Sequence, residues 1–282
     1  MNDSGRPRTS RMTNNTGELE SIARRIRRAA VRMSHDADVP HLGSSLSCVD
    51  ILTALYWATA RIDPAKPDAP GRDRIILSKG HAVSSLYAAL SYRGFFPETT
   101  LASFGRPGAC LAEHPYPGCV PGIEAATGSL GHGLSLGLGM ALAGKTLGLD
   151  YRTFVVLSDG ECNEGSVWEA AMMAPAQKLD NLTAIIDYNR WQATGRSEEV
   201  LALAPLAEKW KAFGWRTQEV DGHDMAALLR ALRAPSGGDE KPSVIVAKTV
   251  KGKGVSFMED NNNWHYRVPN EEELKNALKE LE

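Results

Sequence analysis

A carboxylate and an amide that each follow an apolar segment are the residues of this sequence with the clearest potential for chemistry. Asp159 follows the apolar run 154–157 and a serine, in SDGECNEG, and Asn189 follows the apolar segment 183–186, in IIDYNRWQATG. An apolar run that ends at a glycine-bearing turn is typical of a buried strand. In open α/β sheets, ligands bind outside the carboxyl ends of such strands. Asp159 is therefore either a helix cap on this loop or a ligand for a charged group.

The spacing of these two residues favours a shared ligand. The segment between them is long enough for one crossover helix, so Asp159 and Asn189 would end neighbouring parallel strands at one edge of a sheet. Mg²⁺ takes oxygen ligands in an octahedron and usually keeps positions for phosphate oxygens and water. The main-chain carbonyl of Trp191 is a candidate third protein ligand. We therefore predict a cation site at Asp159, Asn189 and Trp191 that also accepts a diphosphate.

A glycine-rich segment offers a second contact for an anion. Gly128, Gly131 and Gly133 precede an apolar helical run in ATGSLGHGLSLGLGMALA. Glycines let main-chain N–H groups approach a ligand closely, and the N-terminus of a helix favours negative charge. Close packing requires the same residues, so this segment alone does not distinguish an anion site from a packed helix start.

The elements that must position these residues alternate between strands and helices. A strand, a turn and the start of a helix are expected over residues 74–82, and further strands over 153–158, 183–188, 215–220 and 243–248. Helices are expected from Glu18 onward, over 48–60, near 166–178, 204–213 and 224–233, and in the charged C-terminal segment 269–282. Such alternation predicts an α/β fold, a parallel sheet with helices on both faces. We predict one domain over residues 17–282, preceded by a mobile tail of residues 1–16.

Composition limits the classes of function. The chain has 282 residues, of which 43% are hydrophobic, and a net charge of −2, so it can bury a large core and gives no charge-based argument for nucleic acid or membrane as a partner. The sequence shows neither an apolar stretch of membrane-spanning length nor the apolar core of a signal peptide. The four cysteines show no zinc-site pairing and no dense disulfide pattern, so we expect reduced thiols in a cytoplasmic protein. They are Cys48, Cys110, Cys119 and Cys162.

Together, SDGECNEG and DYNRWQATG resemble the thiamine-diphosphate-binding motif of the transketolase family. In that motif a glycine-aspartate-glycine turn is followed about thirty residues later by an asparagine pair, and here Ser158 and Tyr188 replace the first glycine and the first asparagine. The resemblance covers about residues 17–270. It implies the diphosphate-binding domain of the family's fold, thiamine diphosphate as the cofactor, and Mg²⁺, or Ca²⁺ or Mn²⁺, as the metal.

Four histidines occupy segments that match the family in the same order. VPHLGSSLSCVDIL contains His41, LSKGHA contains His81, AEHPYPGCVPGIEAATGSLGHGLSLGLGMALA contains His114, and VKGKGVSFMEDNNNWHY contains His265. The resemblance implies that His114 binds a hydroxyl of the donor sugar and that His81 lies by the diphosphate. It also implies that His41 and His265 handle protons of the donor and acceptor, for which the ordinary histidine pKa of about 6.5 is suited.

The resemblance also implies contacts from the loops. The expected cofactor-binding residues are His81, Gly128, Leu130, Gly131, Asp159, Gly160, Glu161, Asn189 and His265. Glu164 has two readings: a hydrogen-bonded link between the two active sites of a dimer, or a glutamate favoured at a helix start. His132 stands where the family commonly has glutamine, and we interpret it as loop structure. We interpret His35 and His223 as structural histidines.

A counterpart of the family's second domain, which grips the thiamine pyrimidine and supplies an activating glutamate, is not found in this sequence. We therefore expect the N-terminal subunit of a split transketolase, working on sugar phosphates with a separate C-terminal subunit in an α2β2 assembly. One alternative acceptor is the thiol of a lipoyl group or carrier protein, with the arginine-rich helix 24–32 as its contact, although a solvated helix face explains these arginines more simply. They are Arg24, Arg25, Arg27, Arg28 and Arg32. A non-catalytic paralogue is the third alternative, and the intact site residues argue against it.

Overall fold

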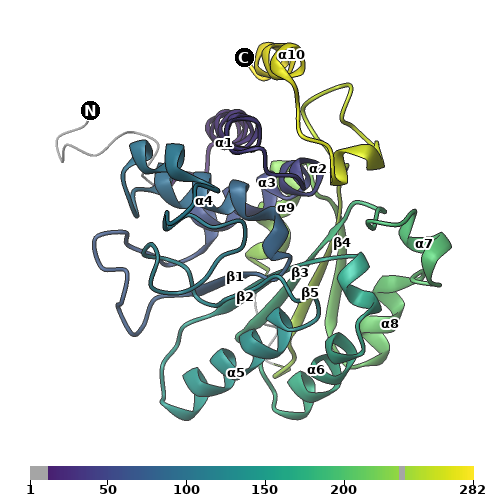
Figure 1. Cartoon of the computed structure of the whole chain (residues 1–282). Helices are drawn as coiled ribbons and strands as arrows, with labels where there is room; N and C mark the ends of the chain where they lie inside the picture. Colours follow the sequence, from purple (N-terminus) through teal and green to yellow (C-terminus); the bar gives the residue numbers. More distant parts are fainter. Residues whose placement is uncertain (1–11, 235–238) are drawn as a thin grey trace.

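A parallel five-stranded sheet forms the centre of the molecule (Figure 1). The computed structural model describes residues 12–234 and 239–282. The strand order is β1-β2-β3-β5-β4, and each neighbouring pair is parallel. The strands are β1 (Arg74–Leu77), β2 (Thr153–Ser158), β3 (Leu182–Tyr188), β4 (Arg216–Asp221) and β5 (Ser243–Lys248). The predicted α/β fold is confirmed.

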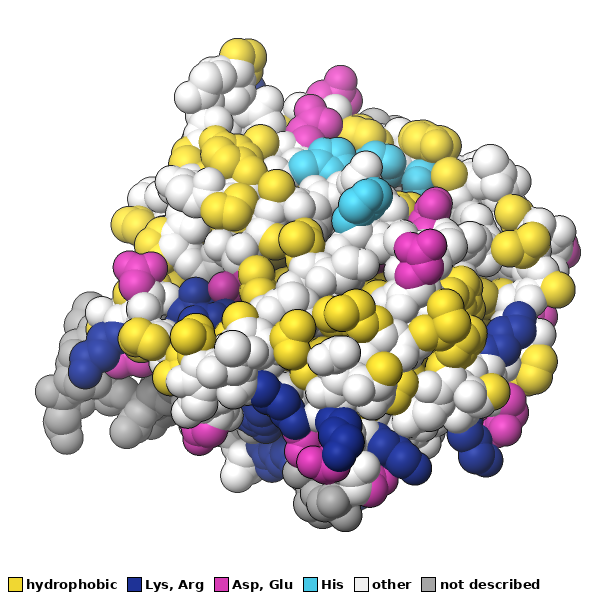
Figure 2. Space-filling model, turned by 90° about the horizontal axis from the view of Figure 1, so that it is seen from below, with side chains coloured by type: hydrophobic (Ala, Val, Ile, Leu, Met, Phe, Trp, Pro, Cys, Tyr) yellow, Lys and Arg dark blue, Asp and Glu magenta, His cyan; other side chains and the backbone are white. Residues whose placement is uncertain are grey.

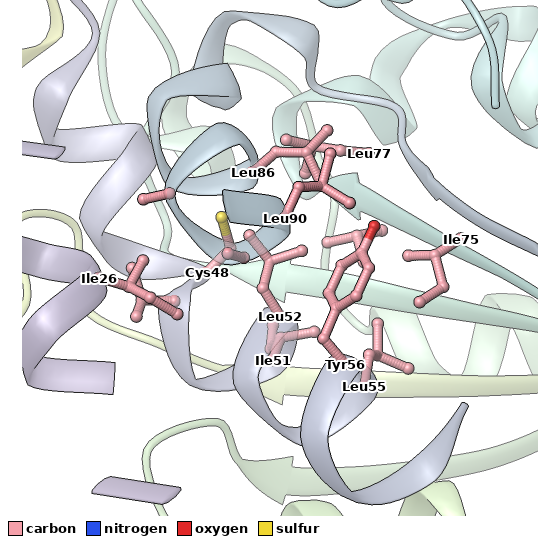
Figure 3. Packing of buried hydrophobic residues seen from close by; sticks show 14 of the residues in the cluster. Ile26, Cys48, Ile51, Leu52, Leu55, Tyr56, Ile75, Leu77, Leu86 and Leu90 are labelled. Carbon is pink, nitrogen blue, oxygen red and sulfur yellow. The ribbon is translucent and has the colours of Figure 1, made fainter. Parts of the chain in front are cut away.

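Helices cover both faces of this sheet because both faces are apolar. Successive residues of a strand point to opposite sides, so Phe154 and Val156 of β2 enter one core and Val155 and Leu157 enter the other. The first core is covered by α3 (Val49–Ala54), α4 (Val83–Arg93) and α9 (Met225–Leu232), with α1 (Thr16–Ala37) packed outside them. The second is covered by α5 (Gly133–Thr146), α6 (Gly165–Ala176) and α8 (Leu206–Ala212). Figure 3 shows Leu52, Tyr56 and Leu86 packed among side chains of the first core.

Shorter elements complete the chain. They are α2 (Leu42–Ser47), the π-helix η2 (Leu55–Thr59), α7 (Ser197–Val200), α10 (Glu271–Glu280) and the 3₁₀ helices η3 (Gly80–Ala82), η4 (Glu98–Ser103), η5 (Gly160–Asn163) and η6 (Asn262–His265). The single helix predicted over 48–60 is wrong in detail, because α3 widens into η2 at Leu55. Helix α10 begins with a capping box between Asn270 and Glu273, which satisfies N–H groups at its first turn.

Helix α1 is amphipathic, but its basic stripe is not wholly exposed. Asn15 caps it by accepting the N–H of Glu18, and Ile22 and Ile26 are buried on the core side. Arg27, predicted on the solvated face, is instead buried and binds both carboxylate oxygens of Asp50. Of the predicted tail 1–16, residues 1–11 lie outside the described residues, whereas the Thr13 N–H donates to the Trp57 carbonyl at 2.9 Å and Asn15 caps α1. No helix within the described ranges has the length and apolar character needed to cross a membrane.

Two cysteines depart from the expectation of four reduced thiols. Cys110 and Cys119 form a disulfide, with their Cα atoms 5.3 Å apart. The segment between them contains two prolines and Gly118, whose φ of 87° helps the chain to reverse. This reversal brings the two thiols together, and nothing in the cysteine spacing alone indicates it. Cys48 and Cys162 are buried free thiols.

Candidate active site

The carboxyl edge of the sheet brings Asp159 and Asn189 together. They follow β2 and β3, which are adjacent and in a register that places Ser158 opposite Asp187. The main-chain N–H of Arg190 donates to Asp159 Oδ2 at 2.8 Å, so the turn after β3 closes directly over the carboxylate. The predicted placement of the two residues at one edge is confirmed. Their part in metal binding stays a prediction.

Asp159 has one oxygen that the protein does not satisfy. Oδ2 accepts from Ser197 Oγ at 2.8 Å as well as from Arg190, whereas Oδ1 is buried and has no hydrogen-bond partner among the described residues. Burial raises the pKa of Asp159 to about 7, although the hydrogen bond from Ser197 lowers it. A buried acceptor without a partner costs free energy, and a hard cation would satisfy it. These residues therefore fit a divalent cation.

The other two predicted ligands lie on the same turn. Asn189 is 3% exposed, and its Oδ1 accepts the N–H of Trp191 at 3.0 Å. The Trp191 ring is fixed from outside by Asp260, which accepts from Nε1 at 2.8 Å, and by the guanidinium of Arg196, 3.8 Å from the ring centroid. Clusters of three or more His, Cys, Asp or Glu suited to a metal are absent from residues 12–234 and 239–282. The predicted ligands include one residue of these types, Asp159. The other two are the amide oxygen of Asn189 and the main-chain carbonyl of Trp191.

Glycines allow the loops at this edge to approach one another. A Cβ on Gly160 would lie 2.8 Å from Cγ of Gln192, on the turn that carries the predicted ligands. A Cβ on Gly128, where φ is 146°, would lie 2.5 Å from Cδ2 of His114. Gly131 has φ of 88° and packs against the start of α6, and Leu130 beside it is half-buried. The predicted glycine loop thus lies between α6 and His114, at the N-terminal side of α5.

Glu161 fastens this loop to the sheet. Its carboxylate is fully buried and accepts from the Gly131 N–H at 2.9 Å and from the Ser158 N–H at 3.3 Å. It also accepts from the Ser78 hydroxyl. Burial raises the pKa of Glu161, against these hydrogen bonds. The side chain predicted to contact the cofactor therefore points into the protein, where it positions the glycine loop.

Three of the four predicted histidines form one group. The ring centroid of His41 lies 4.9 Å from that of His265 and 5.2 Å from that of His81, and His81 and His265 are 5.8 Å apart. His41 precedes α2 with φ of 71°, and its N–H donates to the His265 carbonyl at 2.9 Å. Histidine side chains gather on one face of the molecule in Figure 2.

The rings of this group are held neutral. Burial lowers the pKa of His41, lowers that of His81 well below its ordinary value, and lowers that of His265 to about 3. The charges of neighbouring histidines and lysines shift all three pKa values in the same direction. His41 Nδ1 is buried without a hydrogen-bond partner among the described residues. A neutral imidazole has a nitrogen lone pair that can accept a proton, but a pKa of about 3 makes His265 a weaker base near pH 7 than the ordinary histidine expected from the sequence.

The remaining predicted residues lie around this group. His114 is exposed, and its charge is close enough to lower the pKa of His41. Glu164 is exposed at the start of α6. His132 is exposed before α5, with Nδ1 3.2 Å from the Leu130 carbonyl, so it belongs to the loop as predicted.

His35 and His223, interpreted as structural, each lie beside a carboxylate. His35 Nδ1 is 2.9 Å from Asp36, and His223 Nδ1 is 2.7 Å from Asp50. His223 Nε2 accepts the N–H of Val250 at 2.8 Å. Both ring nitrogens of His223 are thereby occupied by protein groups, as a structural role requires.

Lys251 is a site residue that the sequence analysis missed. It is fully buried, its Nζ lies 3.0 Å from Nδ1 of His265, and it donates to Asn262 Oδ1 at 2.7 Å. Burial, followed by the charge of Lys79, lowers the pKa of Lys251 to about 7. The available signal was its place just after the strand 243–248, in the same segment as His265. A lysine at a strand end is ordinarily solvated, so this signal is weak.

Comparison with known proteins identifies the class. The family model described as "Transketolase, thiamine diphosphate binding domain" matches residues 19–281. The chain is 44% identical over 263 residues to an apulose-4-phosphate transketolase subunit of Phocaeicola vulgatus, covering 93% of each protein. It is 42% identical over 265 residues to the 6-deoxy-6-sulfo-D-fructose transketolase subunit SqwG of a Clostridium species, covering 94% of this chain and 96% of the relative.

Solved structures agree with these relatives. The transketolase from Leishmania mexicana superposes with a TM-score of 0.87 and 27% identity, covering 94% of this chain and 41% of the longer one. The fold is that of a thiamine-diphosphate-binding α/β domain. The chain belongs to the transketolase family. It corresponds to the N-terminal part of full-length transketolases, and two of its relatives are named as separate subunits.

Proposed function

We propose that this chain is the N-terminal subunit of a two-subunit transketolase that depends on thiamine diphosphate and Mg²⁺, or on Ca²⁺ or Mn²⁺. With its partner it transfers a two-carbon ketol unit from a ketose phosphate to an aldose acceptor. The observation that carries the proposal is Oδ1 of Asp159, which has no hydrogen-bond partner among the described residues and lies at the same sheet edge as Asn189 and the glycine loop. This edge combines a place for a hard cation with main-chain groups for a diphosphate.

Each loop has a proposed task. Asp159, Asn189 and the Trp191 carbonyl would hold the cation, and Gly128, Leu130, Gly131 and Gly160 would let main-chain groups approach the diphosphate. His81 would border the diphosphate. The cofactor supplies the carbanion chemistry when bound, so the protein has to bind, orient and exchange protons.

The histidines are proposed to serve the sugars. His41 and His265 are neutral near pH 7 and would accept and return protons on the donor and acceptor. His114, on an exposed loop beside Gly128, would bind a donor hydroxyl. Two relatives are named for apulose 4-phosphate and for 6-deoxy-6-sulfo-D-fructose. An anionic ketose is accordingly the class of donor that we propose.

A separate C-terminal subunit is proposed to complete the enzyme, in an α2β2 assembly. The support is the length match to relatives named as single subunits of transketolases and the 41% coverage of a full-length transketolase. Three large apolar side chains, Leu136, Met172 and Met173, are 41%, 54% and 46% exposed on α5 and α6. Figure 2 looks toward these helices from below and shows hydrophobic side chains spread over this face. Glu164 is exposed at the start of α6, where a link to a second active site is proposed.

Reconstitution tests this proposal. The chain is mixed with the product of the neighbouring gene, thiamine diphosphate and Mg²⁺, and transfer from a ketose phosphate to an aldose phosphate is followed. Turnover is expected only when both subunits are present, and turnover by this chain alone would contradict the split-subunit proposal. Asp159→Ala is expected to lose activity, whereas the matched control Asp150→Ala, at a side chain that is 85% exposed, keeps it.

Transfer to a lipoyl or carrier-protein thiol is the second candidate. Its supporting observation is a cavity of about 380 Å³ on α1 whose wall includes Arg25, Arg28 and Arg32. Arg25 already pairs with Glu98, and Arg28 donates to the Leu278 carbonyl, so much of this charge is used within the protein. Turnover that requires an added carrier protein would favour this candidate over sugar transfer. A single domain over 17–282 is proposed for either activity. A cytoplasmic location is proposed as well, without the support of four reduced thiols, because Cys110 and Cys119 form a disulfide.

A further inference from the structure

We propose that Asp187, paired with the buried Lys79, is a positioning residue that fixes the amide of Asn189 with its oxygen turned toward the cation site. This inference rests on the proposed cation site at Asp159 and Asn189, and it assigns a task to two buried charges that the site described above does not use. Both Asp187 and Lys79 are 0% exposed.

Asp187 accepts hydrogen bonds from donors in four parts of the chain. Its Oδ2 accepts from Ser47 Oγ at 2.6 Å, from Lys79 Nζ, and from Asn189 Nδ2 at 3.1 Å. Its Oδ1 accepts from Thr249 Oγ1. These donors come from α2, from the loop after β1, and from the ends of β3 and β5. Asp187 therefore receives donors around its whole carboxylate.

This environment selects one orientation of the Asn189 amide. An ionised carboxylate only accepts hydrogen bonds, so Asp187 pairs with the NH₂ group of Asn189 and repels its oxygen. On the opposite side, the N–H of Trp191 requires the amide oxygen as its acceptor. Rotating the amide by 180° would break both contacts. Asn189 is 3% exposed, so bulk water has little access to replace them.

The orientation matters because only the amide oxygen can bind a hard cation. An amide NH₂ has no lone pair to offer, whereas the oxygen accepts the Trp191 N–H with one lone pair and keeps the second. Lys79 contributes by balancing the charge of Asp187, since an isolated buried carboxylate would be costly. Lys79 also donates to the Ser44 carbonyl at 2.6 Å, which fixes the pair to α2. Asp187 and Lys79 thus orient the amide oxygen of Asn189 for the cation without binding the cation themselves.

Binding of Mn²⁺ to the two-subunit protein with thiamine diphosphate, followed by electron paramagnetic resonance, tests the inference. Asn at position 187 can donate to the amide oxygen of Asn189, so Asp187→Asn permits the rotated amide. We expect the Mn²⁺ affinity of Asp187→Asn to fall about 10- to 100-fold. Ser47→Ala and Thr249→Val each remove one donor to Asp187 without touching Asn189, and they are expected to bind Mn²⁺ within about twofold of the parent. An equal affinity in Asp187→Asn and the parent would overturn the inference.

A second substitution separates positioning from structure. In the Asp187→Asn background, Asn189→Asp places a carboxylate whose two oxygens both bind cations, so its orientation no longer matters. Mn²⁺ affinity is expected to return to within about threefold of the parent in this double variant. A purely structural loss in Asp187→Asn would persist, and that result would overturn the inference.

A variant that lacks both buried charges covers the case in which Asp187→Asn does not fold. Should Asp187→Asn fail to fold because Lys79 is left unpaired, Asp187→Asn with Lys79→Gln removes both charges, and the same loss of Mn²⁺ affinity is expected. Parent-like affinity in that double variant would overturn the inference. Absence of Mn²⁺ binding by the parent would instead overturn the proposed cation site, and with it the role assigned to Asp187. The two failures are therefore distinguishable.

Discussion

Lys251 and His265 form a partly buried pair in which two groups that both carry positive charge when protonated lie 3.0 Å apart, from Nζ to Nδ1. A protonated lysine only donates, so Nδ1 of His265 accepts and the imidazole proton resides on Nε2. Burial lowers the pKa of Lys251 to about 7 and that of His265 to about 3. The pair therefore carries at most one positive charge near neutral pH, and Lys251 fixes the tautomer of the histidine when the lysine is protonated.

This pair predicts how the stability of the free chain depends on pH. The pKa of Lys251 is about 7 in the folded protein and 10.5 for an ordinary lysine. Between these values the unfolded chain binds the extra proton, so the free energy of unfolding rises with pH, by at most about 1.4 kcal/mol per pH unit from this group. Urea denaturation at pH 7, 8 and 9 should show this rise in the parent relative to Lys251→Met. The control is Lys248→Met, at an exposed lysine, and parallel profiles for the parent and Lys251→Met would contradict the prediction.

Asp159→Asn is expected to stabilise the free chain and abolish its response to a cation. The substitution keeps the acceptor for Ser197 and Arg190 but removes a buried charge whose Oδ1 lacks a partner among the described residues. We expect the free energy of unfolding without cation to rise, because a neutral amide costs less to bury than a carboxylate. Thermal melts with thiamine diphosphate should shift upward on adding Mg²⁺ in the parent and in Asp150→Asn, but not in Asp159→Asn. Equal Mg²⁺ shifts in all three proteins would disprove the cation assignment.

The placement of Asp159 and Asn189 at one edge of the sheet could be predicted from the sequence, because it depends on the local pattern of each strand and the turn after it. Asp159 and Asn189 each stand directly after an apolar strand, and parallel strands joined by one helix end at the same edge. The strands over 153–158 and 243–248 match their predicted bounds, since apolar runs flanked by polar turns leave little choice of boundary. The glycine loop could be located for the same reason, from the apolar helix that follows it.

The buried charges could not be predicted, because their burial depends on contacts between distant segments. Lys79 is paired with Asp187, 108 residues later, and in the sequence each looks like an ordinary residue near a strand end. Arg27 shares a helix with exposed arginines, and only its pairing with Asp50 on α3 shows which one faces inward. The inward turn of Glu161 likewise depends on Gly131, thirty residues away.

Substituting alanine for two glycines of α5 is expected to change stability in opposite directions. A Cβ on Gly137 would lie 2.3 Å from Cγ2 of Val155, on the adjacent strand β2, whereas a Cβ on Gly139 meets no atom within 4 Å. Gly137→Ala is expected to lower the free energy of unfolding by about 1–3 kcal/mol through overpacking. Gly139→Ala is expected to raise it by about 0.4–1 kcal/mol, because alanine loses less conformational freedom in a helix. Denaturant titration of the isolated chain measures both, and similar effects of the two substitutions would contradict this packing of α5.

The disulfide between Cys110 and Cys119 closes the loop that carries His114. We therefore expect the stability of the chain and the KM for the ketose to depend on the redox state of these two cysteines. The two cysteines are nine residues apart and enclose the loop segment that carries this histidine. Opening the loop is expected to lower the free energy of unfolding by about 2–3 kcal/mol, the entropy of closing a loop of this length. On treatment with a dithiol the KM for the ketose should rise several-fold, and the affinity for thiamine diphosphate should fall less, because the Asp159 edge lies outside this loop and the glycine loop meets His114 at Gly128.

Substitution at both cysteines isolates this effect from other consequences of reduction. Cys110→Ser with Cys119→Ser should show the raised KM without any dithiol, and adding the dithiol should change nothing further. Cys48→Ala and Cys162→Ala, at the two buried free thiols, should respond to the dithiol as the parent does. Thiol titration of the denatured parent is expected to find two reactive thiols before reduction and four after it, since each disulfide yields two thiols on gaining two electrons and two protons from the dithiol. Four thiols in the untreated protein would show that the pair is reduced, and the dithiol should then leave the KM unchanged.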